Sequence, residues 1–236
     1  MSPVTRSQEP LLLLPGLLCD HRIWTDQIVA LQQDRTIVVA DYGSADSLSE
    51  MADRVLKVMP RGCAVAGHSM GARVALELWR TAPERFVRLA LLDTGVHAPN
   101  SEEARKRYAL LALGRKAGID ALTDAWLPPM VAPHNRVDPL MRRLREMVRA
   151  AGTDRFEVQI RALLGRPEVA SLLGSITVPT LVGVGRLDIW SPPAQVRALA
   201  QQITGSRYVE FDGAGHMAPA EAPAAVTQAL RGWLSA

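Results

Sequence analysis

Six short apolar runs, separated by longer segments with helical spacing of apolar residues, constrain the fold of this 236-residue chain most strongly. Each run is almost continuously apolar, which is typical of parallel strands that are covered on both faces. Helical segments between parallel strands are the pattern of βαβ units. The sequence therefore predicts an α/β fold with a mostly parallel sheet of about six strands flanked by helices, the strands at residues 11–14, 36–40, 63–67, 87–92, 180–184 and 207–211.

One interval, residues 97–175, contains no convincing strand and only a succession of helix signals. Asn100 is placed as an N-cap, and Asp138-Pro139 predicts a capping residue followed by proline at the first helical position. That helix is expected to end at Gly152, where another follows. The interval is too long for a simple connection, so we expect a helical insertion with a role of its own. Outside it, helices are predicted near residues 24–33, 47–59, 70–81, 193–203 and 222–234.

Composition narrows the class of protein. Hydrophobic residues make up 48% and charged residues 22% of the chain, which is ordinary for a globular domain. A net charge of +3 without a basic arm does not favour nucleic-acid binding. Two cysteines without a CxxC pair predict neither a disulfide framework nor a zinc site, and no apolar run is long enough for a membrane span. We expect a cytoplasmic protein, monomeric or homodimeric, with no metal, cofactor, nucleic acid or membrane partner.

The strongest local signal is Gly67-His68-Ser69-Met70-Gly71, between an apolar run and a helical segment. A G-x-S-x-G motif between a strand and a helix is the nucleophile elbow of serine hydrolases. Glycine is needed at both ends because the tight turn leaves no room for side chains. The serine is then exposed at a helix N-terminus, which favours developing negative charge.

A serine hydroxyl needs a base and an oriented imidazole to become a nucleophile. His216 is favoured because it lies in a glycine-rich loop after the last predicted strand. The partner acid is predicted to be Asp188, which follows the strand at 180–184, with Asp93 as the rival after the strand at 87–92. The remaining histidines are interpreted as surface or packed residues: His21, His68, His97 and His134.

Two backbone amides are expected to form an oxyanion hole for the reacting carbonyl oxygen. Met70 follows the candidate nucleophile and supplies one N–H at the start of its helix. The second is predicted to be the amide of Leu17, because Pro15-Gly16 lets the loop after the first strand turn toward the serine.

These motifs resemble the α/β-hydrolase superfamily, and within it small bacterial serine hydrolases of the carboxylesterase and enol-lactonase type. The resemblance spans LLLLPGLLCD, GHSMGARVALELW, LLDTG, VPTLVGVGRLDIWSPP and FDGAGHMAPAEAPAAV, in that order. Serine as nucleophile argues against the epoxide hydrolases and haloalkane dehalogenases of the same fold. Pro15-Gly16 stands where the family usually has His-Gly, and the short stretch before the first strand leaves no room for the antiparallel hairpin that starts many relatives.

The resemblance also implies a cap. Residues 97–175 would form this helical lid over a core of residues 1–96 and 176–236, and would supply much of the substrate pocket. Expected pocket residues are Leu18, Trp126, Met130 and Trp190, with Tyr108 a further candidate. The activity implied is hydrolysis of a carboxylic ester of a small or medium acyl substrate. A thioester, a lactone or a carbon–carbon bond remains the alternative, as does a non-catalytic, ligand-binding member of the fold.

Overall fold

The computed structural model describes residues 9–236 and contains a single six-stranded sheet in the order β2-β1-β3-β4-β5-β6. Every pairing in it is parallel, and the described part contains no antiparallel hairpin. This confirms the predicted α/β fold. The strands are β1 (Leu11–Leu14), β2 (Ile37–Val39), β3 (Cys63–His68), β4 (Phe86–Leu92), β5 (Thr180–Gly185) and β6 (Arg207–Phe211).

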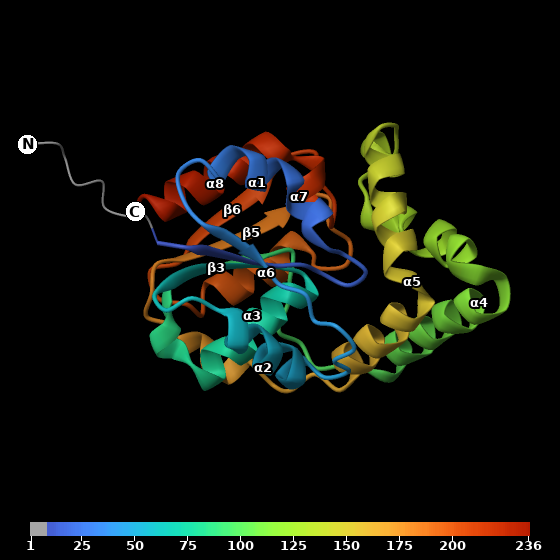
Figure 1. Ribbon diagram of the computed structural model, residues 1–236, viewed down its shortest axis with the longest axis horizontal. Helices are drawn as coiled ribbons and strands as arrows, with labels where there is room; N and C mark the ends of the chain where they lie inside the picture. Colours follow the sequence, from blue (N-terminus) through green and yellow to red (C-terminus); the bar gives the residue numbers. More distant parts are fainter. Residues whose placement is uncertain (1–8) are drawn as a thin grey trace, which may run out of the picture.

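Helices cover both faces of the sheet, which explains why its central strands are apolar throughout (Figure 1). Two helices near the chain ends, α1 and α8, pack together on one face, and α2, α3 and α6 lie on the other. The edge strand β2 is only half-buried, so the expectation of two covered faces fails there. The helices are α1 (Thr25–Leu31), α2 (Leu48–Val58), α3 (Met70–Thr81), α6 (Pro193–Ala200), α7 (Ala218–Glu221) and α8 (Pro223–Leu234).

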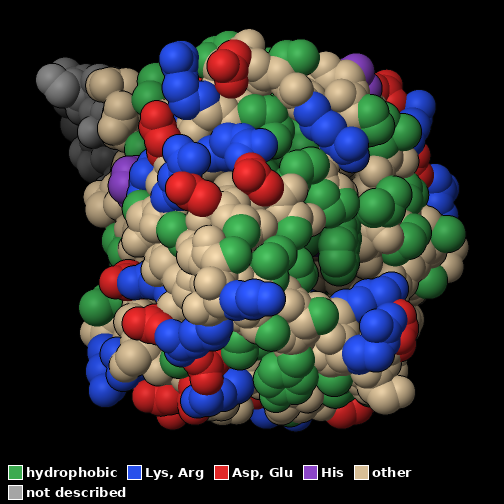
Figure 2. Space-filling view, turned by 90° about the vertical axis from the view of Figure 1, so that its right-hand side faces the viewer, with side chains coloured by type: hydrophobic (Ala, Val, Ile, Leu, Met, Phe, Trp, Pro, Cys, Tyr) green, Lys and Arg blue, Asp and Glu red, His purple; other side chains and the backbone are tan. Residues whose placement is uncertain are grey.

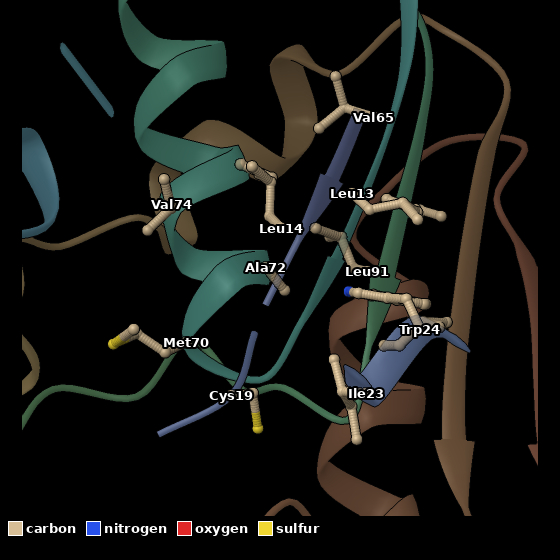
Figure 3. Close-up of a cluster of buried hydrophobic side chains, with 14 of the residues drawn as sticks. Leu13, Leu14, Cys19, Ile23, Trp24, Val65, Met70, Ala72, Val74 and Leu91 are labelled. Atoms are coloured by element: carbon tan, nitrogen blue, oxygen red, sulfur yellow. The ribbon is translucent and has the colours of Figure 1, made fainter. Parts of the chain in front are cut away.

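Alternate residues of β1 fill the two halves of the core (Figure 3). Leu14 points toward Val74 of α3, whereas Leu13 lies on the side of Leu91 and Trp24. All four leucines of β1 are completely buried. Since each buried leucine contributes about 1.5–3 kcal/mol, β1 is anchored firmly and holds the loop that follows it in place.

The strand order reverses at β1, and this determines where a site can form. From β1 the chain moves outward to β2, and it then returns to β3 on the other side of β1. In open α/β sheets the crevice for ligands lies at such a reversal, beyond the carboxyl ends of the strands. The loop at Leu17 follows β1 and Ser69 follows β3, so both begin at this crevice.

A helical insertion connects β4 to β5. Asn100 caps its first helix, because its side chain accepts a hydrogen bond from the Glu103 N–H at 2.9 Å. Positive φ angles at Gly118 and Gly152 interrupt its two long helices, and the second interruption falls where the sequence predicted a helix end. The insertion contains α4 (Ser101–Trp126), η3 (Pro128–Met130), η4 (Pro133–Asn135), α5 (Leu140–Leu164) and η5 (Ala170–Ser175).

The predicted start of α5 was one residue too early. The helix begins at Leu140, and Pro139 is its N-cap rather than its first helical residue. The Pro139 carbonyl accepts the Arg143 N–H at 3.2 Å, as expected of an N-cap residue. Asp138 therefore lies outside the capping position, and no side chain caps α5.

The described part of the chain has neither a helix suited to span a membrane nor a cluster of metal-ligating side chains. None of the helices within residues 9–236 combines the length and the apolar character needed to cross a membrane. The same residues contain no group of three or more His, Cys, Asp or Glu side chains arranged to hold a metal ion.

Candidate active site

Ser69 occupies the sharp turn between β3 and α3 with φ 55° and ψ −116°. The turn is crowded on both sides. A Cβ on Gly67 would lie 2.5 Å from the Cα of Ala72, and a Cβ on Gly71 would lie 2.0 Å from the carbonyl oxygen of Leu14. Any side chain at either glycine would therefore collide with the neighbouring backbone. The backbone of Ser69 has an unfavourable positive φ, and the surrounding packing holds it there.

A chain of two hydrogen bonds joins Ser69 to His216 and Asp188. The Ser69 Oγ lies 2.8 Å from the His216 Nε2, and the His216 Nδ1 lies 2.8 Å from the Asp188 Oδ2. The other carboxylate oxygen of Asp188 accepts the backbone N–H groups of Trp190 at 2.8 Å and Ser191 at 3.0 Å. An acceptor fixed in this way favours the tautomer with the proton on Nδ1, so that Nε2 can accept the serine proton.

Asp93, the rival acid, is near this group but bonded elsewhere. Its Oδ1 accepts the Gly185 N–H at 2.8 Å, and its Oδ2 has no hydrogen-bond partner within residues 9–236. Burial and the neighbouring Asp188 carboxyl raise the pKa of Asp93 well above its ordinary value. Of the two candidate acids, the structure therefore places Asp188 against His216, whereas Asp93 is buried and its raised pKa favours the protonated form.

Two backbone amides face the Ser69 end of the crevice. No hydrogen bond to another group of residues 9–236 uses the N–H of Leu17 or of Met70. The next amide, that of Leu18, donates to the Gln159 Oε1 at 2.8 Å, so a side chain of the insertion fixes the loop. The predicted donor, Leu17, thus keeps a free N–H, whereas the amides of Leu18 and Cys19 are both bonded. Sequence reasoning missed Gln159, because nothing near it in the chain marks it.

His68 is a buried residue that holds the backbone of the His216 loop by a hydrogen bond. Its Nε2 donates to the His216 carbonyl oxygen at 2.7 Å, while a Cβ on Gly16 would lie 3.0 Å from its Nδ1. Burial, together with His216, lowers the pKa of His68 to about 3, so the ring is neutral. The neutral ring carries its single proton on Nε2 and positions the backbone of the His216 loop. The packed position predicted for His68 is the one the structure shows.

A cavity of about 290 Å³ lies over Ser69. Three expected pocket residues line it, namely Trp126, Met130 and Trp190. The structure corrects the fourth: Leu18 is completely buried and does not line the cavity. A positive φ of 58° turns the Leu18 side chain away into the core. Tyr108 is half-exposed and also lies outside the cavity lining, whereas Leu17, Leu110, Phe156 and Leu163 contribute apolar side chains to it.

Glu221 connects the insertion to the His216 loop. Its Oε1 accepts the Met217 N–H at 3.0 Å, and its Oε2 accepts the Ala132 N–H at 2.8 Å and the Asn135 Nδ2 at 3.0 Å. One residue from Met217, the His216 N–H donates to the Met130 carbonyl at 2.9 Å. A single carboxylate at the end of α7 thus holds both sides of the cavity at the histidine. No sequence motif predicted this role of Glu221.

The comparisons with known proteins agree with this architecture. A sequence model described as "Alpha/beta hydrolase family" matches residues 11–229. The protein named "Putative carbamate hydrolase RutD" of Azorhizobium caulinodans is 27% identical over 95% of this chain and 90% of its own length. A thermophilic esterase from Thermogutta terrifontis, solved with malate bound, has a TM-score of 0.88 and 27% identity, covering 97% of this chain and 90% of that one. The enol-lactonase from Burkholderia xenovorans LB400 has a TM-score of 0.86 and 25% identity, covering 99% of this chain and 94% of that one.

Proposed function

Because the chain belongs to the α/β hydrolase family and is a hydrolase of that class, we propose that it cleaves a carboxylic ester of a small or medium acyl substrate. One observation carries the proposal: the unbroken hydrogen-bonded line from Ser69 through His216 to Asp188. A triad of this kind is recognised by its geometry and by the role of each member. The esterase and the enol-lactonase that the chain resembles both have names that refer to cleavage of an ester or lactone.

The chemistry follows from the positions of these groups. Ser69 attacks the ester carbonyl while the His216 Nε2 takes its proton, and Asp188 stabilises the imidazolium that forms. The oxyanion accepts hydrogen bonds from the Leu17 and Met70 amides. His216 then donates its proton to the departing alcohol, which leaves an acyl-enzyme. Water, deprotonated by the same imidazole, attacks this ester and releases the acid and the free serine.

The cavity sets the scale of the substrate. A volume of about 290 Å³ is at the small end of ligand pockets, and its apolar side chains suit a short or medium acyl chain. Trp190, which is 39% exposed, stands beside the cavity and donates from its Nε1 to the Pro129 carbonyl at 3.3 Å.

Covalent labelling tests the nucleophile. A fluorophosphonate probe is expected to label the wild-type protein and the Ser235→Ala control, and to leave the Ser69→Ala variant unlabelled. Ser235 is a suitable control because it lies at the exposed C-terminal end of α8, away from the cavity. Labelling that persists in the Ser69→Ala variant, or that is absent from the wild type, would refute the assignment of the nucleophile.

A panel of substrates tests which class of bond the enzyme hydrolyses. Methyl and p-nitrophenyl esters of short fatty acids are expected to be hydrolysed, and acyl-CoA thioesters and simple lactones to react more slowly at equal concentration. Hydrolysis confined to thioesters, to lactones or to carbon–carbon bonds would keep the triad and overturn the ester assignment. A protein that binds such compounds without turnover or labelling would be the non-catalytic member of the fold.

A further inference from the structure

One end of the cavity over Ser69 is strongly basic. Four cationic side chains line it together with two glutamates, although apolar residues make up the rest of its wall around the serine. Figure 2 shows the face of the molecule with the insertion, where hydrophobic side chains lie between groups of basic and acidic ones. The charged lining residues are Arg73, Lys106, Arg107 and Arg166, with Glu102 and Glu103.

The two glutamates are already bound by bases. Glu103 accepts two hydrogen bonds from Arg166, at 2.8 and 2.7 Å, and one from Arg107 at 2.9 Å. Glu102 is exposed and pairs with Arg105 and Lys106. Neither carboxylate faces Arg73 closely enough to form an ion pair, because no carboxylate of residues 9–236 lies within 4.0 Å of that guanidinium.

Arg73 is therefore a buried cation without an ion-pair partner: Glu103 raises its pKa from a distance, but that carboxylate is already paired with Arg107 and Arg166. Its side chain extends from α3, only 5% of the residue is exposed, and it lines the cavity. Its Nη2 donates to the His97 carbonyl at 2.9 Å, an oxygen that also accepts from the Arg166 Nε at 3.1 Å. Its other guanidinium N–H groups make no hydrogen bond within residues 9–236. A largely buried charge without an ion-pair partner is costly, and an anion bound in the cavity would reduce that cost.

Neighbouring groups respond to the same excess of positive charge. Burial and then Arg166 lower the pKa of Arg73 to about 9, which leaves it charged at neutral pH. Burial and then Arg73 also lower the pKa of His97. Asp93, the remaining acid in the lining, is a poor counter-charge because burial raises its pKa well above the ordinary value. The basic end of the cavity thus carries positive charge that no neighbouring carboxylate fully neutralises, and an anion could bind there.

Ser69 and Arg73 line the same cavity and lie about one helical turn apart in the sequence. Arg73 lies four residues beyond Ser69, which is a rise of about 6 Å along the helix axis. Resting on the proposed function, we infer that Arg73 binds a carboxylate of the substrate, so that the enzyme selects half-esters of dicarboxylic acids over neutral esters. A guanidinium offers a carboxylate two parallel N–H donors, which neither a neutral ester nor an amide matches.

Selectivity between two matched esters tests this inference. The monomethyl esters of glutarate, adipate and suberate are compared with the methyl esters of their monoamides, and methanol release is measured. In the wild type, kcat/KM is expected to be at least about tenfold higher for the best half-ester than for its amide. Arg73→Met is expected to bring this ratio close to one, and Arg73→Lys to give an intermediate ratio. A general loss of folding or of catalysis cancels in the ratio.

The matched control is Arg105→Met, which removes the same charge from an exposed position outside the cavity lining. This variant is expected to keep the wild-type ratio. A wild-type ratio near one, or an equal fall in the Arg105→Met and Arg73→Met variants, would overturn the inference while leaving the proposed ester hydrolysis intact.

A binding measurement separates this inference from the proposed function. The Ser69→Ala protein is titrated calorimetrically with adipate and with its diamide, so that no turnover is needed. Adipate is expected to bind at least about tenfold more tightly than the diamide, and a second substitution, Arg73→Met, is expected to remove the difference. Equal affinities would refute the anion site. Selective binding by a protein that hydrolyses no ester would refute the proposed function alone.

Discussion

Replacing Glu221 by alanine separates the insertion from the His216 loop at one point. The substitution removes the acceptor for the Met217 N–H and for the Ala132 N–H, and also the partner of the Asn135 amide. Each backbone N–H left without an acceptor costs about 1–3 kcal/mol when buried. Because Glu221 is only half-buried, water replaces part of this loss. We expect the Glu221→Ala variant to lose about 2–4 kcal/mol of unfolding free energy, which lowers the Tm by about 5–15 °C.

The Glu221→Ala substitution is also expected to lower the rate of ester hydrolysis. Met217 adjoins His216, and the Met130 carbonyl accepts the His216 N–H, so loosening either segment displaces the imidazole relative to Ser69. A displacement of about 1 Å costs on the order of 10²-fold in rate. We therefore expect kcat on a p-nitrophenyl ester to fall by at least about tenfold, with a smaller change in KM.

Urea unfolding and steady-state kinetics measure the two effects on the same preparations. Glu221→Gln is expected to be intermediate, because an amide keeps one acceptor oxygen and presents N–H groups to the remaining donors. Glu84→Ala is the control, since Glu84 is exposed and makes no ion pair within residues 9–236. If the Glu221→Ala variant unfolds within about 0.5 kcal/mol of the wild type and keeps its kcat, the coupling described above is wrong.

Three further substitutions or reagents probe the interior. Gly71→Ala places a Cβ 2.0 Å from a β1 carbonyl oxygen, so we expect failure to fold or a loss above about 3 kcal/mol by urea unfolding, against no more than about 0.5 kcal/mol for Gly174→Ala, which has open space. Asp93 has a raised pKa in the folded state, so the stability it contributes is complete below about pH 4 and is lost as the pH rises toward that raised value. The Asp93→Asn variant should therefore gain stability relative to the wild type between about pH 4 and pH 8, and an unchanged difference across this range would contradict the assignment. Burial raises the pKa of the Cys19 thiol, and raises that of Cys63 to about 11, so a disulfide reagent at pH 8 should react promptly with both thiols in guanidinium and with neither in the folded protein.

Continuous apolar runs made the strands predictable. The bounds expected for β1 and β6 are those observed; those of β3, β4 and β5 differ by one residue at one end, and β2 is one residue shorter at each end. The two edge strands, β2 and β6, are the exceptions: both are largely half-buried, because each has a neighbouring strand on one side only. Hydrophobicity along the chain reports that a strand is buried, but it does not report the position of that strand in the sheet.

The residues at the centre of the site could be located because each follows a strand. Ser69, Asp188 and His216 come after β3, β5 and β6, and parallel strands end at the same edge of the sheet. Gln159 and Glu221 escaped notice for the opposite reason. They lie within helices and act on backbone groups more than eighty residues away, so no local pattern marks them.

Leu18 shows a second limit. Its place beside Leu17 suggested a pocket residue, but its side chain points into the core, because the chain turns through a positive φ at that residue. Neighbours in a loop commonly face opposite directions, and sequence alone does not reveal the dihedral angles that decide between them.

The chain leaves the sheet after β4 and returns to it at β5, and these two strands are adjacent. The two ends of the insertion therefore meet side by side, and its length can change without altering the register of any strand pair. Trp126 and Met130 belong to the insertion, whereas Ser69 and His216 belong to the sheet edge. This part of the cavity wall can therefore change in evolution while the residues proposed to break the bond stay in place at the sheet edge.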